Sequence, residues 1–306
     1  MELSSLFETC FVIIALMLVG FFAARGGVIP QGYTRATSFL IVNIFLTATI
    51  FQSFCVGGDL SPAELPKVLL AISLMILVCY VLARVTVQLA GKRLGDPAPA
   101  ELCMGVMNNL LIGLPLLSAL FGSTAVLYAG LTSLPFNVLL YTYGVWRLGT
   151  AGGRGGGVRM KDILSPCIYA TLAGLAVFLF RLPVPGFVSR LMGTAAGVSM
   201  PLSMIVIGIT MGSEDLAAAL KDRRVYLAAL VRLVLAPVLV WLLLRPLGLS
   251  PLLLKSCTVI AGCPTGIVVP ILTLQYGHEP EFASNCVIVT TLLSLLTLPL
   301  LLILLG

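Results

Sequence analysis

Ten apolar runs, each long enough to cross a bilayer, dominate this chain of 306 residues. They fall near residues 5–24, 36–56, 66–90, 101–121, 123–146, 163–180, 187–212, 225–244, 252–276 and 282–305. A membrane-spanning helix needs roughly 20 apolar residues, so the runs leave room for short connections and for no sizeable soluble domain. Charged residues make up only 10% of the chain. The sequence therefore predicts an all-α polytopic membrane protein with ten transmembrane helices.

The charges and cysteines exclude several other classes of protein. The net charge of +6 indicates basic cytoplasmic loops, and we expect no nucleic-acid partner. The eight cysteines form no C-x-x-C pair and His278 is the only histidine, so we expect neither a disulfide framework nor a metal site. No H-E-x-x-H motif and no paired intramembrane aspartates occur, which argues against an intramembrane enzyme.

The two halves of the chain align at a nearly constant shift of 154 or 155 residues. The paired landmarks are Gly20 with Gly174, Pro30 with Pro185, Cys103 with Cys257, Pro115 with Pro270 and Gly122 with Gly277. Five spans in each half force the second copy to enter the membrane from the opposite side, so the repeats are predicted to be inverted. We expect a first repeat at 1–149, a cytoplasmic Gly-rich basic linker at 150–162 and a second repeat at 163–306.

The distribution of Lys and Arg predicts the orientation of the chain. With the N-terminus outside, most of these residues fall in the inner loops or at inner helix ends, among them Lys92, Arg93 and Arg223. Because basic short loops stay cytoplasmic, both termini are predicted to be extracytoplasmic. We expect a multi-pass protein of the inner (plasma) membrane.

Runs four and nine are interrupted at matching places by proline and glycine. They read VMNNLLIGLPLL from Val106 and IAGCPTGIVVP from Ile260. A single kink commonly reflects bent packing, but two kinks one repeat apart predict unwound helices that line a cavity. Where half-helices meet, free N–H groups at their N-terminal ends suit a carboxylate or another small anion.

The predicted substrate-binding residues follow from these interruptions. Around them lie Asn108, Asn109, Gly113, Pro115, Pro264, Thr265, Gly266 and Pro270. Further candidates on other runs are Asn43, Thr47, Asn137 and Ser203, although each of these is equally consistent with a hydrogen bond between neighbouring helices.

Arg232 lies well inside run eight, where a charge is costly. It is either a cation that faces the bundle and attracts an anion or stabilises one state, or a side chain that extends to the cytoplasmic surface. Arg84, near an inner helix end, is expected to extend in this way.

No Asp or Glu lies near the middle of a run, so the sequence shows no acidic residue that could carry a coupled proton through the membrane. Sodium remains open as a coupling ion because unwound carbonyls with Asn, Ser and Thr can ligate it.

Several strings resemble the auxin efflux carrier family, which includes plant PIN-type carriers and bacterial malate and malonate permeases. NNLLIGLPL from Asn108 is similar to the family pattern N-T-G-F-I-G-L-P, and further similar strings are LIVNIFLTATIF from Leu40, LPFNVLLYTYG from Leu134 and MPLSMIVIG from Met200. Thr47 and Leu110 depart from the family's usual proline and glycine. The resemblance implies that broken helices four and nine cross at mid-membrane and that transport helices 3–5 and 8–10 move against scaffold helices 1, 2, 6 and 7, through which relatives dimerise.

The sequence thus favours a secondary transporter of small organic anions, with dicarboxylates such as malate or malonate implied by the bacterial relatives. A carrier of another weak acid, such as an auxin-like aromatic carboxylate, is an alternative. A ligand-sensing membrane protein that kept the carrier fold is a second alternative. The expected partners are the small anion, membrane lipid and a second copy of the chain, and no cofactor is expected apart from a coupling ion.

Overall fold

The computed structural model describes residues 3–29, 33–56, 60–152, 166–213 and 215–305. Within these residues the chain consists of helices, their connections and one isolated pair of bridged residues. Six described helical segments are long and apolar enough to cross a membrane: Ala36–Val56, Pro62–Ala90, Asn109–Thr150, Gly186–Ser213, Arg224–Leu247 and Glu281–Leu305. Shorter apolar helices cover Phe11–Arg25, Pro166–Phe180 and Pro251–Ala261. The all-helical, multi-pass prediction is confirmed at this level, and the division into ten spans and two repeats stays a prediction.

One group of helices forms around α1 and α10, and we call it the α1–α10 group. It consists of α1 (Leu3–Arg25), α2 (Tyr33–Leu40), the π-helical turn η1 (Ile41–Leu46), α3 (Thr47–Val56), α9 (Pro166–Phe180) and α10 (Gly186–Ser213). α1 packs along α10, and α3 packs against α9. The α1–α10 contact is backbone to backbone, since a Cβ added to Gly208 would lie 1.9 Å from the carbonyl oxygen of Met17.

The remaining helices form a second group, which we call the crossover group. Its first part consists of η2 (Pro62–Glu64), α4 (Leu65–Ala90), η3 (Gly91–Leu94), α5 (Pro97–Gly105), η4 (Asn109–Gly113), α6 (Leu114–Leu139), η5 (Leu140–Gly144) and α7 (Val145–Gly152). Its second part consists of α11 (Leu216–Lys221), α12 (Arg224–Leu230), η6 (Val231–Leu235), α13 (Ala236–Leu244), η7 (Arg245–Leu247), α14 (Pro251–Ala261), α15 (Val268–Gln275) and α16 (Glu281–Leu305). α5 packs on α4, α13 on α14, and α11 and α12 on α16.

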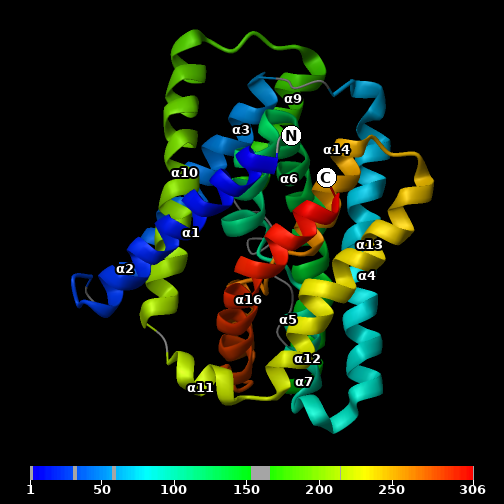
Figure 1. Cartoon of the computed structure of the whole chain (residues 1–306). Coiled ribbons are helices and arrows are strands. Elements are labelled where there is room, and N and C mark those ends of the chain that lie inside the picture. Colours follow the sequence, from blue (N-terminus) through cyan, green and yellow to red (C-terminus); the bar gives the residue numbers. More distant parts are fainter. Residues whose placement is uncertain (1–2, 30–32, 57–59, 153–165, 214, 306) are drawn as a thin grey trace.

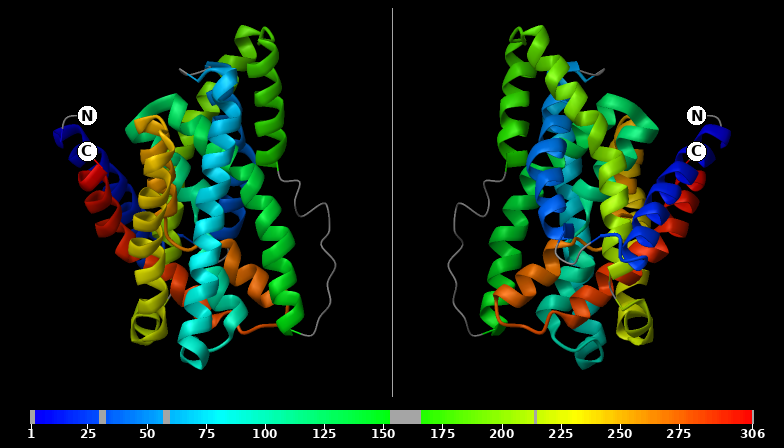
Figure 2. Two further views of the ribbon diagram at one scale, coloured as in Figure 1. Left: turned by 90° about the vertical axis from the view of Figure 1, so that its right-hand side faces the viewer. Right: turned by 90° about the vertical axis from the view of Figure 1, so that its left-hand side faces the viewer.

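The two groups lie on opposite sides of the molecule and meet along α6. Figure 1 shows α1, α2 and α10 on one side and α4, α12 and α13 on the other. α6 packs against both α3 and α9, where the hydroxyl groups of Ser133 and Thr171 lie 3.1 Å apart. The start of α1 and the end of α16 lie close together in Figures 1 and 2, so the described chain begins and ends on the same side of the bundle.

Basic residues gather at one end of the bundle, which we call the basic end. Lys92 and Arg93 lie in η3, between α4 and α5, while Lys221, Arg223 and Arg224 lie around the α11–α12 junction. Figure 1 shows both junctions at the bottom of the view. α7 ends at Gly152 near the same end, and most of the predicted linker 150–162 lies outside the described residues.

Two prolines follow π-helical turns. Pro115 is the second residue after η4, and Pro237 is the second residue after η6. A proline inside an α-helix removes a donor and clashes with the carbonyl four residues earlier, and the wider π-helical turn relieves that conflict. Pro115 therefore continues a helix, and the interruption in run four lies upstream of it.

Candidate substrate site at the helix crossover

The first helix break is built by three residues after α5. α5 begins at Pro97 with Asp96 as its N-cap, and it ends at Gly105. Val106 is extended (φ −93°, ψ 116°), and helical structure resumes at Asn109. The Asn108 side chain caps the new helix, because its Oδ1 accepts a hydrogen bond from the Leu111 amide at 3.3 Å. An asparagine here satisfies one of the donors that every helix start leaves without a partner.

The second break follows α14. α14 begins at Pro251 with Ser250 as its N-cap and ends at Ala261. The chain then leaves helical structure until α15 begins at Val268. Pro264 and Gly266 lie inside this segment, and neither residue favours a continuous helix. Both expected interruptions are therefore present.

The two breaks pair with each other. The Asn108 amide donates to the Pro264 carbonyl at 2.8 Å, and the Gly266 amide donates to the Val106 carbonyl at 3.0 Å. Met107 and Thr265 form the isolated antiparallel bridge between these bonds. A Cβ at Gly266 would lie 3.2 Å from the Met107 carbonyl oxygen, so the close approach favours glycine. We call this paired segment, residues 106–108 and 264–266, the crossover.

Thr265 fixes the crossover to its surroundings through both of its polar groups. Its hydroxyl donates to the Cys103 carbonyl at 2.8 Å, near the end of α5. Its amide donates to the Thr290 hydroxyl oxygen on α16 at 3.1 Å. The side chain of Thr265 is fully buried, and its hydroxyl is committed to the backbone rather than to the cavity described next.

A cavity of about 520 Å³ lies beside the crossover. The crossover residues Met107, Asn108 and Gly266 line it together with Asn109. Its remaining polar lining comes from Ser38, Asn137, Tyr141 and Thr210, and the rest is mainly apolar. None of the described lining residues carries a formal charge.

Asn108 and Asn109 line this cavity and carry side-chain donors without partners among the described residues. Both side chains are buried, and the Nδ2 atom of each has no hydrogen-bond partner among the described residues. A buried donor without a partner costs about 1–3 kcal/mol. An acceptor such as a carboxylate oxygen would relieve that cost, and the N-terminal ends of η4 and α15, which begin beside the crossover, also favour negative charge.

Of the four further candidates on other helices, only Asn137 lines the cavity. Asn43 donates to the Phe39 carbonyl and Thr47 to the Val42 carbonyl, and neither lines the cavity. Ser203 is buried on α10, outside the lining. Asn137 does line the cavity, although its amide donates to the Ser133 carbonyl at 2.8 Å.

The predicted glycine and proline positions downstream of each break lie outside the crossover. Gly113 and Pro115 follow the first break by several residues, in η4 and at the start of α6. Pro270 is the third residue of α15, where its missing amide would have had no partner within the helix. These residues lie in the second half-helices, and of the predicted residues only Asn108, Pro264, Thr265 and Gly266 belong to the crossover itself.

Arg232 does not extend to the surface. It lies in η6, and its side chain is fully buried. Its Nε donates to the Cys263 carbonyl at 2.8 Å, and its Nη2 donates to the Ala261 carbonyl at 2.8 Å. Nη1 donates to the Met104 carbonyl at 3.1 Å. Of the two interpretations offered by the sequence, the structure supports the one in which Arg232 faces the bundle.

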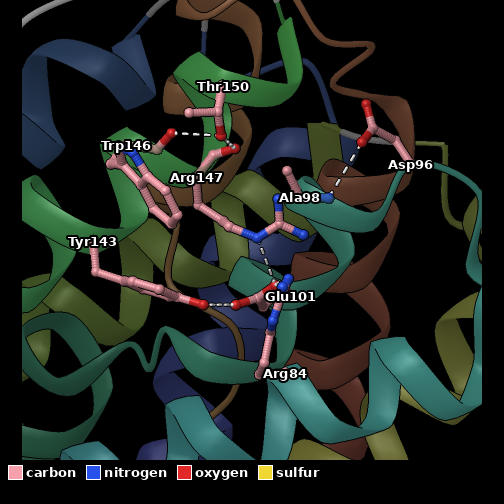
Figure 3. A network of polar contacts seen from close by, with 8 residues as sticks. All are labelled: Arg84, Asp96, Ala98, Glu101, Tyr143, Trp146, Arg147 and Thr150. Carbon is pink, nitrogen blue, oxygen red and sulfur yellow. Dashed lines mark hydrogen bonds and ion pairs between the residues drawn. The ribbon is translucent and has the colours of Figure 1, made fainter.

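A buried carboxylate, Glu101, was missed by the sequence analysis. It lies on α5 with a fully buried side chain. Figure 3 shows it between two arginines: Arg84 Nη1 and Arg147 Nε each donate to its Oε2 at 3.0 Å. The Tyr143 hydroxyl donates to Oε1. Arg84, expected to extend toward solvent, has 40% of its side chain exposed while its guanidinium bonds to Glu101.

His278 forms a second group of buried polar contacts near the basic end. Its Nδ1 lies 2.5 Å from an oxygen of Asp96, and its Nε2 lies 2.9 Å from the Leu148 carbonyl. His278 lies in the connection between α15 and α16, and it is buried. Asp96 thus caps α5 and contacts His278 in the α15–α16 connection, and His278 in turn contacts α7.

Comparison with known proteins shows the family of this chain. The profile of a family described as "Membrane transport protein" matches residues 5–154 and 156–302. The chain belongs to this membrane transport family. The two matched segments together cover nearly the whole chain and divide close to the predicted linker.

Individual relatives agree with the family. An uncharacterized transporter of Methanothermobacter thermautotrophicus is 24% identical over 299 residues, which are 96% of each chain. A candidate malonate transporter of Rhizobium meliloti is 30% identical over 142 residues, which are 46% of this chain and 44% of that protein. Auxin efflux carrier component 1 of Arabidopsis thaliana is 27% identical over 150 residues, which are 48% of this chain and 24% of the relative. The resemblance to the auxin efflux carrier family is confirmed.

Proposed function

We propose that this protein is a secondary transporter that binds small organic anions in the cavity beside the crossover. The observation that carries the proposal is the pair of buried, unpartnered amide donors of Asn108 and Asn109 in the cavity lining. They lie at the start of η4, beside the start of α15, so hydrogen-bond donors and helix N-termini converge on one small volume. The described lining residues are uncharged, so these donors and helix N-termini would contact the anion directly.

Two features support the inverted repeat within this proposal. α5 begins at the basic end and α14 at the other end, so the two half-helices approach the crossover from opposite directions (Figure 1). Gly122 and Gly277, paired at a shift of 155 residues, both adopt positive φ, at 73° and 83°.

We extend the proposal to an elevator motion of the crossover group against the α1–α10 group. The ion pairs of Glu101 join α4, α5 and α7, and Arg232 joins η6 to both half-helices, so the crossover group is linked internally by polar contacts. The α1–α10 group would then be the scaffold, the surface for a homodimer, and the positive-inside rule would place the basic end in the cytoplasm of a plasma-membrane protein.

Two substrate classes have specific support. A dicarboxylate such as malonate or malate is favoured by the Rhizobium meliloti relative. An aromatic monocarboxylate is favoured by the lining side chains Phe39, Phe136 and Tyr141, which offer apolar surface to a ring, and by the Arabidopsis thaliana relative.

Uptake into proteoliposomes tests the proposal. Purified protein is reconstituted, and uptake of labelled malonate, malate and indole-3-acetate is measured for wild type, Asn108→Ala and Asn109→Ala. A hydrogen bond to a charged group contributes about 1.5–3 kcal/mol, so each variant should weaken substrate affinity by about tenfold or more. Asn43→Ala is the matched control, because it removes the same group from a residue outside the cavity lining.

The results discriminate between the open alternatives. Loss of uptake in the Asn108 and Asn109 variants, with Asn43→Ala unaffected, supports the cavity as the substrate site. Equal uptake in all variants places the site elsewhere. Saturable binding of these acids without uptake in either membrane direction indicates a ligand sensor rather than a carrier.

A further inference from the structure

Arg232 brings a permanent positive charge to the crossover, away from solvent. The acceptors of its guanidinium are backbone carbonyls: Met104 at 3.1 Å, Gly105 at 3.5 Å, Ala261 at 2.8 Å and Cys263 at 2.8 Å. No Asp or Glu among the described residues forms an ion pair with it. Main-chain carbonyls rather than a carboxylate therefore offset the charge.

The carbonyls that Arg232 contacts lie at helix C-terminal ends, where a positive charge is most stabilising. Met104 and Gly105 end α5, and Ala261 ends α14. The last four carbonyls of a helix lack partners within it and carry the negative end of its dipole. Two such ends converge at the crossover, so their partial charges repel one another unless a positive charge lies between them. The guanidinium bonds to both ends at once.

Carbonyls of unwound helices are also the ligands with which carriers of this general build bind a coupling sodium ion. The sequence left sodium coupling open for that reason. Here the guanidinium already bonds to the carbonyls at the ends of both half-helices.

We infer that Arg232 is a resident cation that takes the place of a coupling ion at the crossover, so that anion transport does not require sodium there. The inference rests on the proposed carrier function, but its electrostatic part concerns the folded protein alone. Arg232 acts as a positioning residue: it holds the ends of α5 and α14 together, and the second half-helices begin on the far side of the same break. Removing the guanidinium should create a requirement for a free cation.

Thermal unfolding in different salts tests the electrostatic part without any substrate. The midpoint is measured for wild type and Arg232→Gln in sodium chloride and in choline chloride at equal ionic strength, with and without millimolar guanidinium. The wild-type midpoint should be the same in both salts. Arg232→Gln should lower it by on the order of 5 °C or more, and sodium or guanidinium, but not choline, should restore part of the loss, because a ligand that binds only the folded state stabilises it.

Two further variants separate this role from general packing. Arg232→Lys keeps a cation with three donors and should show no salt preference. Arg245→Gln removes an exposed arginine that stacks on Trp241 and should also show none. A wild-type midpoint that rises saturably with sodium but not with choline would overturn the inference, as would an Arg232→Gln protein that responds to no cation.

Malonate uptake into proteoliposomes tests the coupling part. Wild type and Arg232→Lys should take up malonate at equal rates in sodium and in choline. Wild-type uptake that requires sodium would also overturn the inference. If neither malonate, malate nor indole-3-acetate is transported in either salt, the proposed function fails, while the unfolding experiment still decides whether Arg232 is the resident cation.

Discussion

Replacing Glu101 with glutamine should destabilise the fold more than any other single change of an acidic residue in the described chain. Glu101 accepts hydrogen bonds from two arginines and Tyr143, and its side chain is fully buried. Glutamine keeps the size of the side chain but removes its charge and replaces one acceptor oxygen with a donor. The arginines would then face an amide instead of a carboxylate.

The loss of folding stability in Glu101→Gln depends on how exposed its two arginine partners are. A hydrogen bond to a charged group contributes about 1.5–3 kcal/mol. The Arg84 side chain is 40% exposed, so solvent screens its pair and its share is at most about 1 kcal/mol. The Arg147 side chain is only 14% exposed, and its share is larger. We therefore expect Glu101→Gln to lower the free energy of unfolding by roughly 2–4 kcal/mol, with Arg147→Ala costing more than Arg84→Ala.

Buried thiols provide the assay. Cys79, Cys103, Cys257, Cys263 and Cys286 are free and buried, so a fluorogenic maleimide labels them only as the protein unfolds on heating. One kcal/mol corresponds to about 2–4 °C in a large domain, so the Glu101→Gln midpoint should fall by roughly 4–16 °C.

Glu64→Gln is the matched control. Glu64 is exposed at the opposite end of α4 and belongs to a capping box, so its loss should shift the midpoint only slightly. A Glu101→Gln midpoint no lower than that of Glu64→Gln would refute the reasoning, since the buried cluster would then add nothing to stability.

Three further predictions follow from other contacts. Gly208→Ala should separate α1 from α10 and sharply reduce the yield of folded protein, because its Cβ would lie 1.9 Å from the Met17 carbonyl oxygen, whereas Gly186→Ala meets nothing within 4 Å and should fold normally. Gly266→Ala should fold but transport slowly, because its Cβ would press on Val106 and Met107 at 3.1–3.2 Å; normal uptake would show that the crossover tolerates a side chain. The hydrogen bond from Arg224 lowers the pKa of Asp222 from its ordinary 3.8, so the pair stabilises the fold above that pH and loses this contribution as the pH falls through the lower pKa of the folded state. The midpoints of wild type and Asp222→Asn should accordingly differ slightly at pH 7 and converge in acid.

The sequence located the crossover because the residues that break helices are local signals. Pro264 and Gly266 destabilise a helix wherever they lie, and Asn108 is a favoured helix cap. The sequence could not place the first break to within a few residues, since Pro115 is accommodated after a π-helical turn. The break at 106–108 instead coincides with hydrogen bonds to a segment more than 150 residues away.

The Glu101 cluster depends on contacts that no local pattern reveals. Its partners Arg84, Tyr143 and Arg147 come from separate helices, and each alone looks like a polar residue near a membrane surface. One signal was available: Glu101 is the only charged residue between Asp96 and Arg147. Local sequence also could not show that Asn43 and Thr47 donate hydrogen bonds to carbonyls of their own helical segment, as they do in the structure.

The two hydrogen bonds that join the half-helices run between backbone atoms only. Their geometry does not depend on which side chains project from residues 106–108 or from most of the cavity wall. Mutations that reshape the wall can therefore accumulate while the intersection of the helices is preserved. A single architecture could in this way be adapted to chemically different cargoes across a lineage, one lining residue at a time.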